Sequence, residues 1–298
     1  MIIFVKINLN TNYKRPPCMK WYHKYLSVYG KPFRDAPPEL VAKVRTQILR
    51  LQSAEPLVSV VVIAHNEEKH LLANLWSLSD TISRFPLEII GVDNNSNDCT
   101  PEIYRAVGVP CHSETRQSHG YARNCGLAHA KGKYHICIDS DTLYPPHYVE
   151  TMIEALSRPG IAGVYSLWGY MPDRDHSALG LFFYELSRDI YLRIQSVNRP
   201  ELSVRGMVFA FVTEQGRQIG FRVNIKRGED GALANGLKQF GKLKFITSRK
   251  ARAITGYGTV GQSLFKSFKV RAVKALKGIK RIFTRQKEYK DIESNLIK

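Results

Sequence analysis

The sequence predicts an α/β protein built on a mostly parallel sheet with helices on both faces. Three apolar, β-branched runs carry this prediction: LVSVVVIA at 57–64, LEIIGVD at 87–93 and KYHICID at 133–139. Such continuous runs are typical of strands that are buried on both faces. A segment with helical spacing of apolar residues, or a polar turn that enters a helix, follows each run. This alternation favours right-handed crossovers and a parallel sheet.

The remaining elements of the first half follow the same rhythm. An irregular aromatic and basic leader ends in an expected helix, PPELVAKVRTQILRLQ, with Pro38 near its first turn. The pattern then predicts helices over 65–82, 94–107, 118–132 and 146–157, with a short strand near 107–111.

The second half is less regular. It predicts a strand over 161–170, a long amphipathic helix over 178–197, a strand over 203–213, a helix over 228–241 and a final strand over 242–247. The simplest organisation has three parts: a leader (1–56), one catalytic domain (57–255) and a basic C-terminal tail (256–298). Within the domain, 57–145 would bind the donor and 146–255 would form the acceptor side.

The charge distribution points to a second feature. The chain has 298 residues and a formal charge of +18, and 231–287 carry fifteen Lys or Arg and no Asp or Glu. This segment favours contact with a polyanion or an anionic membrane surface. No apolar run approaches the roughly 20 residues of a membrane-spanning helix, and MIIFVKINLN lacks the order of a signal peptide. We therefore expect a cytoplasmic protein.

Two acids, Asp139 and Asp141, follow the third buried run. In an extended chain, side chains at i and i+2 point the same way, roughly 7 Å apart. Neighbouring carboxylates repel each other unless a cation or a donor offsets them. The pair therefore predicts a site for a hard divalent cation, Mn²⁺ or Mg²⁺. The alternative is a pair of solvated turn acids.

The other strand ends are also polar: Ala64-His65-Asn66-Glu67 and Asp93-Asn94-Asn95-Ser96. In open α/β sheets, ligands bind beyond the carboxyl ends of the strands. Asp93 could accept hydrogen bonds from a base or a ribose, or serve only a turn or helix cap. The sequence has no G-x-G-x-x-G and no Walker lysine loop after the early strands, which disfavours dinucleotide cofactors and P-loop chemistry.

Three motifs in this order, VSVVVIAHNEE, GVDNNSNDCT and GYARNCGLAHAKGKYHICIDSDT, resemble glycosyltransferase family 2, which has the GT-A fold. The resemblance covers about 57–145. It implies that the first two strand ends hold the nucleotide of a sugar donor, and that the D-x-D acids hold the ribose and a metal on the diphosphate. It assigns nucleotide-sugar contacts to Ala64, His65, Glu67, Asp93, Arg123, Asp139 and Ser140, and metal contacts to Asp141 and Asp139.

The same resemblance extends to RGEDGALANGL in the second half. It implies that Asp230 is the general base that deprotonates an acceptor hydroxyl, with Glu229 as the alternative. Direct displacement assisted by one base inverts the anomeric configuration. The family's processive members have a Q-x-x-R-W motif, which this chain lacks, so a single addition is expected. The chain also has IAHNE where many members have proline and tyrosine.

The tail sequence SLFKSFKVRAVKALKGIKRIFTRQK places apolar residues at helical spacing among many cations. Residues 260–287 therefore predict a helix on an anionic membrane surface, and the alternative is a helix packed on the domain. Nothing else resembles a nucleic-acid-binding module. A membrane location would suit a glycan or lipid-linked acceptor, as in bacterial surface polysaccharide assembly. The donor would be UDP- or GDP-linked.

Two other functions remain open from sequence alone. A sugar-phosphate nucleotidyltransferase uses a similar sheet, but would be expected to have a glycine-rich loop with a lysine where this chain has AHNEEKH. A catalytically inactive membrane scaffold is disfavoured by the presence of Asp93, Asp139, Asp141 and Asp230.

Overall fold

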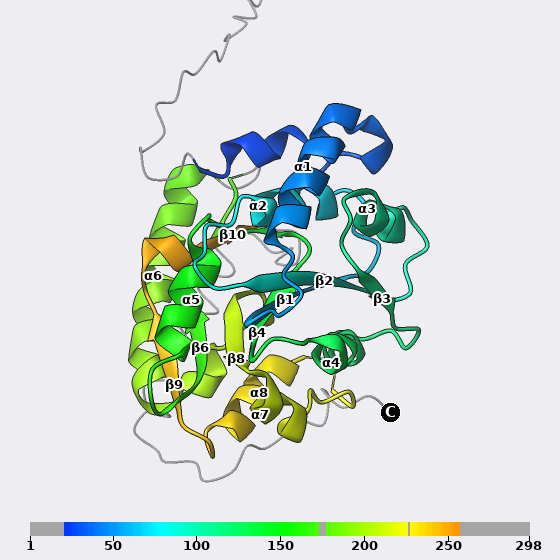
Figure 1. The fold of residues 1–298 in the computed structure, drawn as a ribbon. Coiled ribbons are helices and arrows are strands. Elements are labelled where there is room, and N and C mark those ends of the chain that lie inside the picture. The colour runs from blue at the N-terminus through cyan, green and yellow to red at the C-terminus, as the bar shows by residue number, and fades with distance from the viewer. Residues whose placement is uncertain (1–20, 173–176, 226, 257–298) are drawn as a thin grey trace, which may run out of the picture.

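The computed structural model describes residues 21–172, 177–225 and 227–256. A seven-stranded mixed sheet forms its centre, in the order β3-β2-β1-β4-β8-β6-β9 (Figure 1). Its strands are β1 (Val58–Ala64), β2 (Leu87–Asp93), β3 (Cys111–Ser113), β4 (Tyr134–Asp139), β6 (Ile161–Ser166), β8 (Phe209–Val212) and β9 (Lys242–Ile246). The first four are parallel, and β8 runs antiparallel to both β4 and β6. The predicted mostly parallel sheet is confirmed.

A second, three-stranded sheet borders the first. It has the order β5-β10-β7 and consists of β5 (Thr142–Leu143), β10 (Ala253–Thr255) and β7 (Trp168–Tyr170). The predicted strand over 161–170 is therefore two strands, because the chain leaves the large sheet after Ser166 and joins the small one at Trp168. This small sheet brings the end of the described chain next to the turn that follows β4.

Helices cover both faces of the large sheet. One face packs against α1 (Pro38–Leu51), α2 (Leu71–Ser79), α3 (Thr100–Ala106) and α5 (Tyr148–Leu156). The other packs against α4 (His119–His129) and α8 (Glu229–Leu237), with α7 (Thr213–Ile219) beside α8 (Figure 1). The long helix α6 (Ala178–Asn198) runs along one side of the molecule.

Alternating burial explains the two layers. On β1, Val58, Val60 and Val62 belong to the core on the α1 and α2 side, whereas Val61 and Ile63 pack toward α4. A strand with apolar residues at successive positions on both sides, as in residues 60–64 of β1, is expected to be buried on both faces. The leader also joins this core through the buried Tyr22 and Tyr25, which lie on and beside a 3₁₀ turn at His23–Ser27.

The strand register aligns the polar strand ends. Ala64 at the end of β1 pairs with Asp93 on β2, and Ile63 pairs with Asp139 on β4. Parallel strands of matched length therefore place the three tips side by side at one edge of the sheet, where the strand order reverses direction.

Several predicted boundaries are wrong. The helix expected over 65–82 spans only Leu71–Ser79, because the preceding residues form a strand-end loop with Asn66 at φ 54°. The short strand expected near 107–111 is Cys111–Ser113. The strand expected over 203–213 is reduced to β8, after a 3₁₀ turn at Gly206–Val208.

No helix in the described part of the chain is both long enough and apolar enough to cross a bilayer. The predicted membrane-binding segment, 260–287, lies outside the described residues.

Candidate active site

A cavity of about 410 Å³ opens at the carboxyl ends of the parallel strands. Seven of the ten residues predicted from sequence line it: Ala64, His65, Glu67, Asp139, Ser140, Asp141 and Asp230. The first six come from the ends of β1 and β4 and the loops that follow. Asp230 comes from the first turn of α8, so the tertiary fold joins the predicted donor side and acceptor side in one cavity.

Hydrogen bonds fix the first two strand ends against each other. The backbone N–H of Asn66 donates to Ser96 Oγ at 2.9 Å, and Asn97 N–H donates to Asn66 Oδ1 at 2.9 Å. His65 Nδ1 lies 2.8 Å from the Asn94 carbonyl oxygen, so this nitrogen must be the protonated donor. These contacts hold the polar tips in place before any ligand arrives.

Asp139 ends β4 and Asp141 lies in the turn before β5, so the two do not lie in one extended strand, which corrects the expected i, i+2 geometry. Asp141 Oδ1 accepts a hydrogen bond from Thr142 Oγ1 at 3.0 Å. Burial, followed by repulsion from Asp139 and Glu67, raises the pKa of Asp141 to about 6. A carboxylate in such surroundings gains strongly from a nearby cation.

Asp139, Asp141 and Glu67 offer carboxylate oxygens in this part of the cavity, and a hard divalent cation prefers such ligands. Within the described residues, however, no three His, Cys, Asp or Glu side chains form a preformed metal-binding group. The two D-x-D acids can therefore hold a metal only together with oxygens from a ligand or from water.

Arg123 connects Asp139 on the strand-end side of the site to Asp230 on α8. Its side chain is 4% exposed, donates from Nη2 to Asp139 Oδ1 at 2.7 Å, and forms an ion pair from Nε to Asp230 Oδ1 at 3.1 Å. It does not line the cavity, so the structure places it as a link between the acids. Its predicted contact with the nucleotide stays a prediction.

Asp230 is held on its other oxygen as well. The Gly206 backbone N–H donates to Asp230 Oδ2 at 2.6 Å. A Cβ on Gly206 would overlap Arg123 Nη2 and lie 2.7 Å from Asp230 Oδ1, so only glycine fits here. Burial raises the pKa of Asp230 to about 6, although Arg123 acts in the opposite direction.

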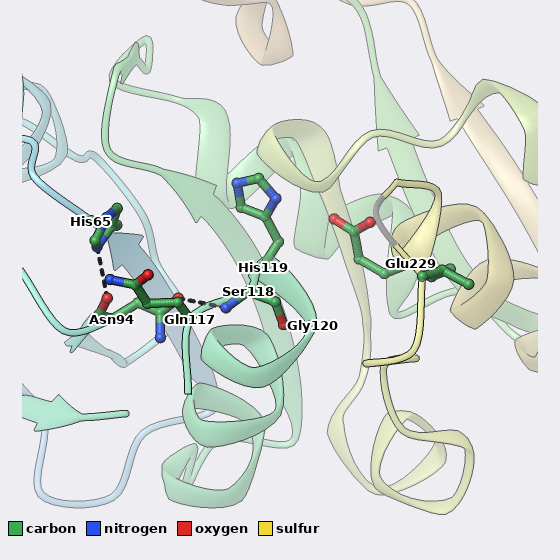
Figure 2. A pocket seen from close by; sticks show the side chains of 8 residues that line it. His65, Asn94, Gln117, Ser118, His119, Gly120 and Glu229 are labelled. Carbon is green, nitrogen blue, oxygen red and sulfur yellow. Dashed lines mark hydrogen bonds between the residues drawn. The ribbon is translucent and has the colours of Figure 1, made fainter. Parts of the chain in front are cut away.

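Glu229 is adjacent to Asp230 but belongs to a second, smaller cavity of about 240 Å³. Figure 2 shows its carboxylate directed across this space toward His119. Successive helix residues differ in direction by about 100°, which explains why the two neighbouring acids face different spaces. The two cavities share three lining residues, His65, Asn94 and His119.

Asp93 does not line either cavity. It is buried, and its Oδ2 accepts a long hydrogen bond of 3.4 Å from Ser96 N–H, which is the turn role weighed as the alternative. Its predicted nucleotide contact remains a prediction.

Sequence reasoning missed several lining residues and their supports. Asn94 had a local signal, because it follows Asp93; its side chain ties the β2 end to the Glu114 and Arg116 carbonyls and to Ser118 N–H. Tyr29 had no such local signal, because it lies in the leader. Its hydroxyl donates to the Asp141 carbonyl at 2.8 Å. Other lining residues come from distant segments: His119, Tyr170, Arg205, Gly206, Met207, Thr255 and Gly256.

Solved structures of known proteins have a similar fold. One solved structure is a mannosyltransferase, PcManGT, from Pyrobaculum calidifontis, in complex with GDP-Man and Mn²⁺. It has a TM-score of 0.55 and 20% identity, over 83% of this chain and 73% of that one. Another is Staphylococcus aureus TarS in complex with UDP, with a TM-score of 0.50 and 19% identity, over 67% of this chain and 60% of that one. At these identities, the likeness concerns the fold.

Two curated relatives match part of the chain. A 4,4'-diaponeurosporenoate glycosyltransferase of Staphylococcus haemolyticus is 33% identical over 121 residues, which are 38% of this chain and 32% of that protein. Glycosyltransferase GlyG of Streptococcus pneumoniae is 29% identical over 140 residues, 45% of each protein. The chain thus spans less than half the length of these two relatives.

The model of the family described as "Glycosyl transferase family 2" matches residues 59–212, just over half of the chain. This range runs from β1 to β8 and includes both strand-end loops, Arg123 and the D-x-D acids. The chain belongs to glycosyl transferase family 2.

Proposed function

We propose that the protein transfers a sugar from a nucleotide-diphosphate donor, UDP- or GDP-linked, to an acceptor hydroxyl, with inversion and a single addition. One observation carries the proposal. Asp230 and the pair Asp139 and Asp141, far apart in the chain, line the same cavity, and Arg123 links Asp230 to Asp139. A base beside a diphosphate-binding corner is what direct displacement at an anomeric carbon requires.

The donor would lie along the strand ends. Ala64, His65 and Glu67 offer polar and backbone groups for the nucleoside, and Asp139 and Ser140 lie next to them in the lining. Arg205, which also lines the cavity, carries a positive charge that suits a diphosphate. The GDP-Man and Mn²⁺ bound to PcManGT, and the UDP bound to TarS, illustrate this ligand class in the same fold.

Asp141 and Asp139 would hold Mn²⁺ or Mg²⁺ together with the donor's phosphate oxygens. When bound, the metal supplies positive charge that stabilises the departing nucleoside diphosphate.

Asp230 would accept the proton of the acceptor hydroxyl. Arg123 and the Gly206 N–H hold its carboxylate in one orientation, and its pKa of about 6 keeps it ionised at neutral pH while making it more basic than an ordinary aspartate. Glu229, in the smaller cavity, is the alternative base. The acceptor would be a glycan or a lipid-linked sugar in surface polysaccharide assembly, on the cytoplasmic face of a membrane.

Thermal unfolding of the full chain with UDP or GDP, each with and without Mn²⁺, tests the donor class. One nucleotide should raise the melting temperature only when metal is present. Incubation with a panel of UDP- and GDP-sugars should then release the matching nucleoside diphosphate. If neither nucleotide stabilises the protein with metal, the proposal fails.

A further inference from the structure

Helix α6 carries a continuous apolar stripe on its outer side. Ten large apolar side chains are exposed among the described residues, and seven of them lie on this helix, with exposed fractions of 47% to 79%: Leu179, Phe182, Phe183, Leu186, Ile190, Ile194 and Val197. At about 100° per residue, all seven fall within an arc of roughly 120°. The other three, Leu49, Ile82 and Phe240, lie on separate segments.

The charged residues of α6 leave only a cation on its outer side. Its two acids, Glu185 and Asp189, are both directed to the protein, where Arg252 pairs with each of them at 2.7 Å. Asp189 also pairs with the buried Arg188. On the outer side, the stripe is accompanied by the exposed Arg193, and no acid of α6 is exposed. The outer surface of the helix is therefore apolar with positive charge.

Further exposed cations lie on the segment that anchors α6 to the protein. The 3₁₀ turn Arg249–Ala251 directly precedes Arg252, and its Arg249 and Lys250 are exposed. Because Arg252 is bound to α6, this basic turn is tethered to the same helix. An apolar stripe that includes the exposed Arg193 complements the interface of an anionic bilayer, in which acyl chains lie beneath negative headgroups.

We propose that the outer face of α6 docks on an anionic lipid surface. Monomeric soluble proteins rarely expose contiguous apolar patches of this extent unless the patch has a partner. At 21 residues, the helix is about 30 Å long. It does not have the hydropathy of a membrane span, so it lies in the plane of the interface, with its phenylalanine and aliphatic side chains among the acyl chains.

Helix α6 is also connected to the wall of the cavity. Glu185 Oε1 accepts a hydrogen bond from Tyr170 N–H at 2.6 Å, and Tyr170 lines the cavity. Strand β7, which contains Tyr170, pairs with β10, whose Thr255 is another lining residue. The helix that binds the bilayer is thus attached to the part of the cavity wall assigned to the acceptor. This consequence rests on the proposed function, whereas the docking does not.

Flotation of the full chain with vesicles of phosphatidylcholine and phosphatidylglycerol tests the proposal. The variant replaces Phe182, Phe183 and Ile190 with Gln, which removes apolar area without adding charge. The control replaces Leu49 and Ile82 with Gln; these are apolar side chains of similar exposure, 52% and 55%, on other segments. We expect the α6 variant to lose on the order of tenfold or more in vesicle partitioning, and the control to float like the original chain.

Varying the salt concentration distinguishes lipid binding by α6 from lipid binding by basic residues elsewhere in the chain. Flotation is measured at about 0.15 M and at about 0.5 M salt. Purely electrostatic binding weakens at the higher concentration, whereas insertion of apolar side chains persists. We expect residual flotation of the original chain at high salt, and its loss in the α6 variant. Thermal melting of each variant, monitored by circular dichroism, establishes that both are folded.

Two outcomes overturn the proposal. If the α6 variant floats like the control at both salt concentrations, the stripe does not bind lipid. If flotation is unchanged and light scattering shows that the variant converts an oligomer to a monomer, the stripe is a contact between copies of the chain. Neither measurement requires a donor or an acceptor, so the docking can fail or succeed independently of the proposed function.

Discussion

The two walls of the cavity are built in different ways. One wall consists of the ends of β1 and β4 and the loops after them, each a short stretch of consecutive residues that follows a buried strand. The other consists of single residues and short turns from distant segments: Tyr170, the 205–207 turn, Asp230 and the 255–256 strand end. The first wall is set by topology, because parallel strands bring their ends together. The second depends on how a less regular half packs against it.

Replacing Asp230 with Asn should have the largest effect, because it removes the proton acceptor while leaving the shape. We expect kcat to fall by about 10²- to 10⁴-fold with the metal-dependent binding of nucleotide retained. Steady-state kinetics with the donor identified by the panel, together with nucleotide titration, would measure both.

The neighbouring acid provides the control for this comparison. Glu229→Gln changes a carboxylate one residue away that faces the smaller cavity. Its kcat should fall less than about tenfold, below the usual range for loss of a general base. The reverse order of effects would assign the base to Glu229.

Asp141→Asn tests the wall that topology sets. The variant should lose the metal-dependent rise in melting temperature with nucleotide and at least about 10² in kcat/KM, since metal stabilisation of a leaving group is worth several kcal/mol. The folded pKa of Asp141, about 6, lies above the ordinary aspartate value of 3.8. Ionisation of Asp141 therefore costs stability, and this cost appears as the pH rises between these two values.

The metal-free Asn variant avoids that cost. Above pH 6 it should melt at a higher temperature than the metal-free original chain, and below pH 4 the difference should disappear. A variant that is less stable than the original chain at pH 7 without metal would contradict the repulsive role assigned to this corner.

Gly206→Ala tests the second wall. The added Cβ would meet Arg123 and Asp230, so the link between the two walls must shift. We expect a loss of about 1–3 kcal/mol in the free energy of unfolding, as for other overpacking substitutions, and a fall in kcat. Denaturant unfolding would measure the first.

The matched control is Gly231→Ala, one residue after Asp230. Its Cβ would meet only the Glu201 carbonyl oxygen, at 3.1 Å. Equal stability losses in the two variants would show that Gly206 has no special relation to Arg123.

The smallest expected effect concerns pH. Glu229 raises the pKa of Asp230 by charge repulsion, after the larger effects of burial and of Arg123, which act in opposite directions. Glu229→Gln should therefore lower the pKa of Asp230, and the acidic limb of kcat/KM, centred near pH 6 in the original chain, should move to lower pH. A shift to higher pH would contradict this coupling.

The sequence by itself determined the sheet and most of one wall. Predominantly apolar runs such as VSVVVIA and YHICID are typical of strands buried on both faces, and in a parallel sheet the polar residues that follow them share one edge. The resemblance to the family then assigned Ala64, His65, Glu67, Asp139, Ser140 and Asp141 to the donor and its metal before the fold was known. Asp230 was found because its short motif resembles that of the family.

Only the tertiary structure decided the contacts that are long in sequence and have no local pattern. Arg123 links the acids because Asp139 and Asp230 pair with different nitrogens of its guanidinium, and Gly206 is required because a Cβ there would meet both Arg123 and Asp230. Tyr29 reaches Asp141 from the leader only because the leader packs into the main core. The apolar period of α6 was visible in the sequence, but which side of the helix faces outward was settled by Arg252, which holds its acidic residues against the protein.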